Sequence, residues 1–241
     1  MNKFMHSFEG AYMSTKATVA TMQWLGILKV AVGIIVGAML VFVSAGAMFE
    51  EASMFTVSLL PATDKDDLGG LEISLSETAD FAEPTIVLSA EGVESMTNIS
   101  YTWLPTGLDD TDGAHNGENY MAYTFYVKNV GEGPGTLREI INVDSSLLGA
   151  DEAIRVRVYR DGRATTYAKM AADGLPETGT TPFESDDVVF SNDIPDVKAG
   201  QILKYTLVIW LEGDDPECLD NIKGGNVKMS MTFEVGDEPQ T

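Results

Sequence analysis

The stretch that decides the fold class of this chain reads Ile154-Arg-Val-Arg-Val-Tyr-Arg-Asp-Gly-Arg-Ala-Thr-Thr-Tyr-Ala-Lys169. Apolar and polar side chains alternate along its first half, which is the period of a β-strand with one buried face. Asp161-Gly162 then separates this run from a second extended run. Asp-Gly between two such runs is typical of a two-residue type I′ turn, because both central residues need positive φ. The stretch therefore predicts a β-hairpin.

The same pattern continues on both sides of the hairpin. Further runs with alternating or β-branched and aromatic side chains cover residues 53–59, 71–76, 120–128, 201–211 and 226–235. Loops rich in glycine, proline and aspartate separate these runs. None of the runs has the period of an amphipathic helix. Many strands of this kind in one chain predict an all-β sandwich.

The N-terminal part has a different character. Residues 30–49 form a run of 20 residues without a charge, long enough to cross a bilayer as a helix. Three lysines precede this run, and Glu50 and Glu51 follow it. Because cytoplasmic flanks carry the positive charges, we expect everything after Phe49 to lie outside the cell.

Small residues close this apolar run, in the sequence Ser44-Ala-Gly-Ala47. A signal peptidase reads such a pattern, so we expect cleavage between Ala47 and Met48, with an uncleaved anchor helix as the alternative. Residues 1–47 are then a cytoplasmic leader with a signal or anchor helix. Residues 48–241 are one extracellular domain. The chain touches the membrane only through residues 30–49, so we expect the protein to be secreted or displayed on the cell surface.

The charge of the chain restricts its partners. Its formal net charge is −22, and the first 47 residues contain three of its lysines but only one glutamate. An exported domain this acidic is expected to avoid nucleic acid and anionic membrane surfaces.

Cys218 is the only cysteine, so no internal disulfide can stabilise the fold. We interpret it as a buried thiol, with a cross-link between subunits as the alternative.

No residue pattern indicates an enzyme. A histidine-built zinc site needs two histidines one helical turn apart, whereas the chain contains only His6 and His115. No G-x-S-x-G motif is present either. The acidic loop around His115, Asp109–Glu118, lacks the ligand spacing of an EF-hand. We therefore predict no catalytic residues.

A second acidic loop, Glu212–Asp220, links the last two predicted strands. Its carboxylates are either a solvated loop or a calcium site built from Asp214, Asp215 and Glu217, since hard cations bind clustered oxygens. No other cofactor is expected. Leu175-Pro-Glu-Thr-Gly179 matches the pentapeptide that sortases cut. The apolar segment and basic tail of a sorting signal do not follow it directly, so we interpret it as a loop.

Four arginines of the predicted hairpin lie within nine residues: Arg155, Arg157, Arg160 and Arg163. They are either the charged solvent face of an edge strand, which prevents aggregation, or a docking stripe for an acidic copy of the same protein.

Several of these segments together resemble the TasA/camelysin family of exported bacterial matrix-fibre proteins. The resemblance lies in Tyr123–Gly131, the Arg155–Tyr167 hairpin, Tyr205–Cys218 with its Trp-Leu-Glu-Gly-Asp-Asp-Pro-Glu-Cys run, Gly224-Gly225, and Met229–Phe233. It implies a jelly-roll-like antiparallel β-sandwich, processing by a dedicated signal peptidase, and polymerisation into biofilm fibres with other matrix components. The leader differs from the family pattern at Ser44–Glu51, and nothing here carries the proteolysis described for camelysins.

The resemblance also implies that the N-terminal strand is donated to the next subunit. Phe55, Val57 and Leu59 alternate on one face of that strand. A neighbouring sheet would bury these side chains and pair their backbone groups. The alternative is that this strand pairs within its own chain. The sequence thus predicts a structural fibre subunit, or alternatively a membrane-anchored, adhesin-like module that binds through loops such as Asp109–Asn119.

Overall fold

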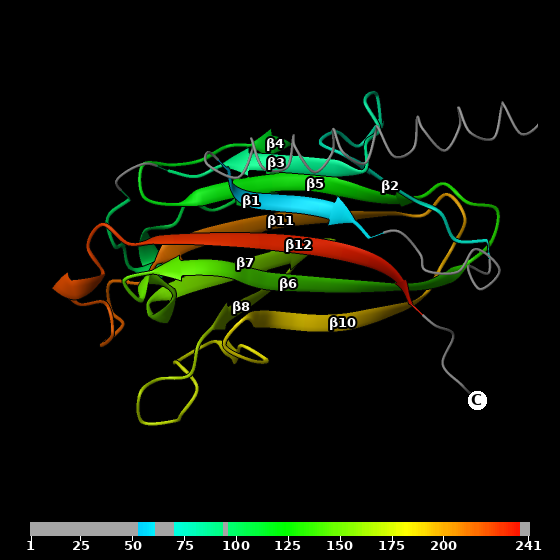
Figure 1. The fold of residues 1–241 in the computed structure, drawn as a ribbon. Helices are drawn as coiled ribbons and strands as arrows, with labels where there is room; N and C mark the ends of the chain where they lie inside the picture. Colours follow the sequence, from blue (N-terminus) through cyan, green and yellow to red (C-terminus); the bar gives the residue numbers. More distant parts are fainter. Residues whose placement is uncertain (1–52, 61–69, 94–95, 237–241) are drawn as a thin grey trace, which may run out of the picture. The chain divides into compact units, whose positions relative to one another are not determined.

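The computed structural model of the protein describes residues 53–60, 70–93 and 96–236, all within one compact unit (Figure 1). The expected leader, the apolar run 30–49 and the cleavage site at Ala47 and Met48 lie outside the described residues. Among the residues that are described, no helix has the length and apolar character needed to span a membrane.

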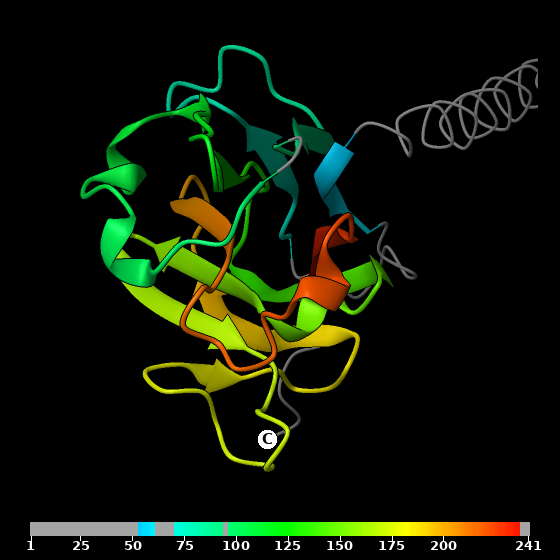
Figure 2. The same cartoon turned by 90° about the vertical axis from the view of Figure 1, so that its left-hand side faces the viewer.

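The strands form two sheets, which confirms the all-β prediction. The order in the five-stranded sheet is β10 (Val188–Val197), β6 (Gly135–Leu147), β12 (Asn226–Gly236), β1 (Ser53–Leu59) and β3 (Val87–Glu91). The order in the seven-stranded sheet is β2 (Ile73–Ser76), β5 (Met121–Asn129), β11 (Ile202–Leu211), β7 (Ile154–Arg160), β8 (Arg163–Ala168) and β9 (Thr181–Pro182), with β4 (Gly113–Ala114) beside β5. The two sheets face each other across a shared core (Figure 2).

The sheets are mixed, which corrects the expectation of a purely antiparallel sandwich. Most neighbouring strands are antiparallel, but β1 runs parallel to β12, and β8 runs parallel to β9. Parallel neighbours cannot be joined by a tight turn and need a long connection. For β1 and β12 that connection is the whole domain, because β1 is its first strand and β12 its last.

Helical structure is sparse in the described parts of the chain. It consists of short 3-10 turns, which are η2 (Tyr101–Trp103), η3 (Leu108–Asp110), η4 (Ala150–Glu152) and η5 (Asp220–Ile222). The first two lie between β3 and β5, so they belong to the long segment that crosses from one sheet to the other.

The predicted hairpin is present as β7 and β8. Asp161 and Gly162 have φ of 50° and 78°, so both central residues lie in the left-handed region that a type I′ turn requires. Arg160 and Arg163 are partners on either side of the turn, and the pairing continues to Val156 opposite Tyr167.

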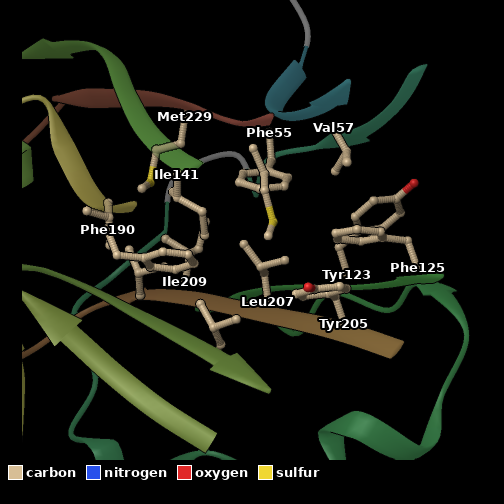
Figure 3. Close-up of a cluster of buried hydrophobic side chains, with 14 of the residues drawn as sticks. Phe55, Val57, Tyr123, Phe125, Ile141, Phe190, Tyr205, Leu207, Ile209 and Met229 are labelled. Atoms are coloured by element: carbon tan, nitrogen blue, oxygen red, sulfur yellow. The ribbon is translucent and has the colours of Figure 1, made fainter. Parts of the chain in front are cut away.

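The core lies between the sheets (Figure 3). Phe55, Val57, Ile141 and Met229 point from the five-stranded sheet toward aromatic and aliphatic side chains of β5 and β11. The rings of Phe125 and Tyr205 stack with centroids 5.4 Å apart, and Phe233 meets both of them edge-on. Each fully buried side chain of this size contributes about 1.5–3 kcal/mol to folding.

A smaller apolar cluster lies on the opposite face of the seven-stranded sheet. Its buried members are Ile99, Leu108, Ala122, Val208 and Trp210. Ile99 and Leu108 come from the crossover segment, which therefore covers part of this outer face. Residues 100–102 of the same segment line a cleft on this face.

Candidate functional site

The first candidate site is the position of β1 in its sheet. β1 lies between β12 and β3, with Phe55 opposite Met229, Val57 opposite Met231 and Leu59 opposite Phe233. Figure 1 shows β1 alongside β12. All three side chains named from the sequence are therefore on the inner face of a strand that pairs within its own chain.

These three side chains are buried to different degrees. Phe55 and Val57 are completely inaccessible to solvent, whereas Leu59 is partly buried at the end of the strand. Beyond the strand, the amide of Leu60 donates to the carbonyl of Phe233 at 3.0 Å. The strand is thus held by core packing and by hydrogen bonds along both edges.

β1 also connects β3 to the rest of its sheet. In the described residues, β3 is an edge strand whose ladder partner is β1. Without β1, the facing edges of β12 and β3 would lose their hydrogen-bond partners, and Phe55 and Val57 would be missing from the core. Unpaired strand edges of this kind accept a strand from another chain.

The second candidate site contains Arg155 and Arg157 of the hairpin together with the acidic loops. Arg155 is buried, and its Nη2 lies 2.6 Å from Oδ2 of Asp215 and 3.3 Å from Oε2 of Glu177. Glu177 belongs to the Leu-Pro-Glu-Thr-Gly segment, and Asp215 belongs to the loop after β11. Arg155 therefore joins two loops to β7, and these loops cover its side chain on the outer face of the sheet.

The proposed calcium ligands are only partly brought together. One carboxylate oxygen each from Glu177, Asp215 and Glu217 lies within 4.8 Å of the others. Asp214 lies apart from this group and accepts a hydrogen bond from Ser100 Oγ at 2.7 Å. Burial and the neighbouring Asp215 carboxylate raise the pKa of Glu177. Such oxygens suit a hard cation, but the Arg155 guanidinium already supplies positive charge among them.

A third charged group, Glu139, is buried between the sheets and was not identified from the sequence. Its carboxylate accepts hydrogen bonds from Tyr205 Oη and Arg160 Nη1, both at 2.6 Å. Burial raises the pKa of Glu139, and the hydrogen bonds from Tyr205 and Arg160 offset part of this increase. Arg160 is therefore occupied by a carboxylate of its own chain. Arg163 is exposed at the turn.

Arg157 has a different environment from its neighbours. Its guanidinium lies over the rings of Tyr101 and Tyr159, at 5.2 Å and 5.1 Å from their centroids, and Nη1 donates to Thr166 Oγ1 at 2.9 Å. Its Nε is buried without a hydrogen-bond partner. Among the described residues, no carboxylate forms an ion pair with it.

Arg157 lines a cleft of about 520 Å³ on the outer face of the seven-stranded sheet. Strand residues Arg155, Arg157, Thr166 and Trp210 contribute to it, together with residues 100–102 and 177–180. No pattern in the sequence predicts this cleft directly, although two arginines of the hairpin and the Leu-Pro-Glu-Thr-Gly segment both contribute to it.

The loop Asp109–Asn119 is held by its own His115 and by side chains of the neighbouring strands β5 and β11. The ring nitrogens of His115 lie 2.8 Å from the carbonyl oxygens of Gly113 and Leu108. Tyr126 Oη donates to Asp112 at 2.6 Å, which adds to the effect of burial in raising the pKa of Tyr126 to about 12. His115 thus organises the loop through backbone contacts.

Comparisons with known proteins identify no family for this chain. No family model matches it, and no curated protein matches it. A β-glucosidase from Kluyveromyces marxianus is similar at 13% identity with a TM-score of 0.26, over 76% of this chain and 18% of that one. The macrocyclisation enzyme AvmM of alchivemycin A biosynthesis is similar at 12% identity with a TM-score of 0.21, over 51% of this chain and 83% of that one. The chain thus spans less than a fifth of the glucosidase. Similarity this low carries no argument about function.

Proposed function

We propose that this protein is a structural subunit of an extracellular fibre, of the TasA/camelysin kind, which assembles when β1 of one subunit occupies the β1 position of the next. The observation that supports the proposal is the place of β1 itself. It is the first strand of the domain, it lies between β12 and β3, and its Phe55 and Val57 side chains are fully buried in the core.

Exchange of β1 between subunits would preserve the contacts seen in one chain. The same apolar side chains would enter the same core, and the same backbone hydrogen bonds would form with β12 and β3. The contact between subunits is head-to-tail, so it continues as a filament when the geometry does not close a ring. A jelly-roll-like body, export past the apolar run 30–49, and release by a signal peptidase at Ala47 and Met48 are parts of the same proposal.

A disulfide that locks β1 in its own chain tests this proposal. Thr56 and Ser230 are register partners on β1 and β12, and they lie between the core-facing pairs, so their side chains point to the opposite face. In a Cys218→Ser background, Thr56→Cys with Ser230→Cys would place two thiols on directly adjacent strands, within disulfide range. We expect the oxidised variant to stay monomeric and the reduced variant to form filaments in negative-stain electron microscopy.

A second disulfide provides the matched control. Ser145 on β6 and Lys228 on β12 are register partners. A disulfide from Ser145→Cys with Lys228→Cys would join these two strands without involving β1. We expect this variant to form filaments in either redox state. Filaments from the oxidised Thr56→Cys/Ser230→Cys variant would contradict assembly through β1.

A surface-binding module is the alternative function, favoured by the cleft around Arg157. Exposed aromatic side chains accompany this cleft on η2, where Tyr101 is 48% and Trp103 is 73% exposed. A chain that remains monomeric on a sizing column under every condition, while binding a ligand in this cleft, would favour the alternative.

A further inference from the structure

We propose that the Leu-Pro-Glu-Thr-Gly segment, residues 175–179, is a latent substrate of sortase-class transpeptidases, which the folded domain protects by holding the bond to be cut inside a hydrogen-bonded turn. The segment lies between β8 and β9, so the inference does not depend on exchange of β1.

The reaction defines what such an enzyme needs from its substrate. A cysteine thiolate of the enzyme attacks the carbonyl carbon of Thr178. The bond between Thr178 and Gly179 breaks, and the Gly179 nitrogen takes up a proton and leaves as an amine. A second amine then loses a proton, attacks the thioester and releases the thiolate. Peptides that are read side chain by side chain bind in extended form, so these residues must be extended in the enzyme.

Exposure alone would permit the reaction. Leu175 is 62% exposed, and Pro176, Thr178 and Gly179 are also exposed. In Figure 1 the yellow-green loop that follows β8 projects beyond the sheets. Exposed loop tips are preferred sites of chain cleavage. The conformation of the segment, and not its burial, therefore decides whether it can be cut.

The bond between Thr178 and Gly179 is the central peptide bond of a turn. The amide of Thr180 donates to the carbonyl oxygen of Glu177 at 3.1 Å, and Thr180 Oγ1 donates to the same oxygen at 2.9 Å. Gly179, the third residue of this turn, has a φ of 75°, which a type II turn requires at that position. A chain that closes a turn over residues 177–180 cannot be extended there at the same time.

The residues before the turn are held as well. Pro176 forms an isolated antiparallel bridge with Met170, and the amide of Ala171 donates to the carbonyl of Leu175 at 2.9 Å. The segment is thus tied down on both sides of the bond, and several contacts must break together before it can straighten.

The side chain of Glu177 adds a further tie, to Arg155 on β7 at 3.3 Å. This ion pair is the weaker part of the arrangement, because Arg155 lies closer to Asp215, at 2.6 Å. Burial and the Asp215 carboxylate also raise the pKa of Glu177. The turn itself is therefore the main protection.

Cleavage at this position would not separate the two parts of the chain. The part that begins at Gly179 contains β10, β11 and β12. Of these, β11 pairs with β5 and β7, and β12 pairs with β6 and β1. The two fragments would stay joined through both sheets, unlike a terminal sorting signal, in which the part after the glycine is released.

Treatment of the full chain with a purified sortase and triglycine tests the proposal. The reference substrate is a synthetic peptide of residues 173–182. Because the folded chain reacts only through its open form, we expect it to be cut at least about tenfold more slowly than the peptide. Mass spectrometry under denaturing conditions identifies the two products, one ending in Thr178 joined to triglycine and the other beginning at Gly179.

Two variants identify the source of the protection, and each is compared with a peptide of its own sequence. Thr180→Pro leaves the pentapeptide intact but removes the amide and hydroxyl donors of the turn, so its rate relative to its peptide should rise by about fivefold or more. Glu177→Gln removes the ion pair and should give a smaller rise. Thr165→Val, at an exposed threonine of β8, is the matched control and should behave like the wild type.

Circular dichroism of each variant verifies that the β-fold is retained. Cleavage of the folded wild type as fast as its peptide would overturn the proposal. So would a Thr180→Pro variant that remains as resistant as the wild type, relative to its own peptide. An unchanged relative rate for Glu177→Gln would overturn the part assigned to Arg155.

Discussion

Nη2 of Arg155 lies 2.6 Å from Oδ2 of Asp215, and both side chains are almost completely shielded from solvent. This ion pair joins β7 to the loop between β11 and β12, and Glu177 extends it to the loop that contains Leu-Pro-Glu-Thr-Gly. A segment that resembles a sorting signal is therefore attached to the domain through its central glutamate.

Replacement of Arg155 should be among the most damaging changes on this face of the protein. Arg155→Met leaves the buried Asp215 and the partly buried Glu177 without a cation, and breaking a buried pair from one side typically costs about 3–5 kcal/mol. Urea unfolding at pH 7 measures the loss in the free energy of unfolding. Arg163→Met, at an exposed position, should change it by less than about 0.5 kcal/mol. Equal effects of the two substitutions would show that the ion pair has no structural role.

Truncation of the β1 side chains should follow their burial. Phe55→Ala removes a ring that is fully enclosed between the sheets, and we expect a loss of about 3–5 kcal/mol in the free energy of unfolding. Leu60→Ala, just beyond the strand and 43% exposed, should cost much less. Denaturant unfolding of the monomer compares them. If Phe55→Ala proved as mild as Leu60→Ala, the placement of β1 in its own sheet would be wrong.

Acid should weaken the fold through Asp151, among other carboxylates. Burial acts to raise the pKa of Asp151, but hydrogen bonds from Lys169 and Ser146 outweigh it and hold the pKa below its usual value. A lowered pKa in the folded state means that the stabilisation is present above the unfolded pKa, about 3.9, and is lost as pH falls through the folded pKa.

Asp151→Asn isolates this contribution. The difference in unfolding free energy between wild type and variant should be largest above about pH 5 and should shrink as the pH falls below about 4. Urea midpoints measured from pH 2 to pH 7 give this difference. A difference that is constant over the whole range would exclude the Asp151–Lys169 pair as its source.

Cys218 is partly buried, which corrects the expectation of a fully buried thiol, and it should still be poorly reactive. Burial is the main cause that raises its pKa, and the carboxylates of Asp215 and Glu212 act in the same direction. Since the thiolate is the reactive form, labelling by Ellman's reagent at pH 8 should be slower in the folded protein than in urea. Assembly of Cys218→Ser should equal that of the wild type. Rapid labelling in the native state, or loss of filaments in Cys218→Ser, would instead indicate a cross-linking cysteine.

The sequence predicts strands well where one face alternates strictly. Strict alternation predicts β1 and β7, and runs rich in apolar, β-branched or aromatic residues predict β2, β5, β8, β11 and β12. The type I′ turn at Asp161-Gly162 has the required dihedral angles. The longest strand, β6, escaped prediction. Its inward positions are Leu137, Glu139, Ile141 and Val143, so a charged residue interrupts the apolar face. Glu139 is tolerated there because Tyr205 and Arg160, distant in sequence, donate to its carboxylate.

The candidate sites were less predictable, because they depend on which loops meet. Asp214 and Asp215 are neighbours in sequence, yet Asp214 pairs with Ser100 while Asp215 pairs with Arg155. Asp214 lies in a turn just after β11, and this turn sends the two neighbouring carboxylates to different partners, so a run of carboxylates in the sequence need not converge on one point. Glu177 joins Asp215 only through the fold. No local pattern in the sequence connects these two residues.

Disulfide trapping between subunits tests the central claim most directly. Two variants in the Cys218→Ser background, one with Thr56→Cys and the other with Ser230→Cys, are mixed as monomers, allowed to assemble and then oxidised. If β1 of one subunit lies beside β12 of the next, non-reducing electrophoresis will show a mixed disulfide dimer whose yield follows filament formation. Filaments that form from the mixture without this cross-link would contradict assembly through β1.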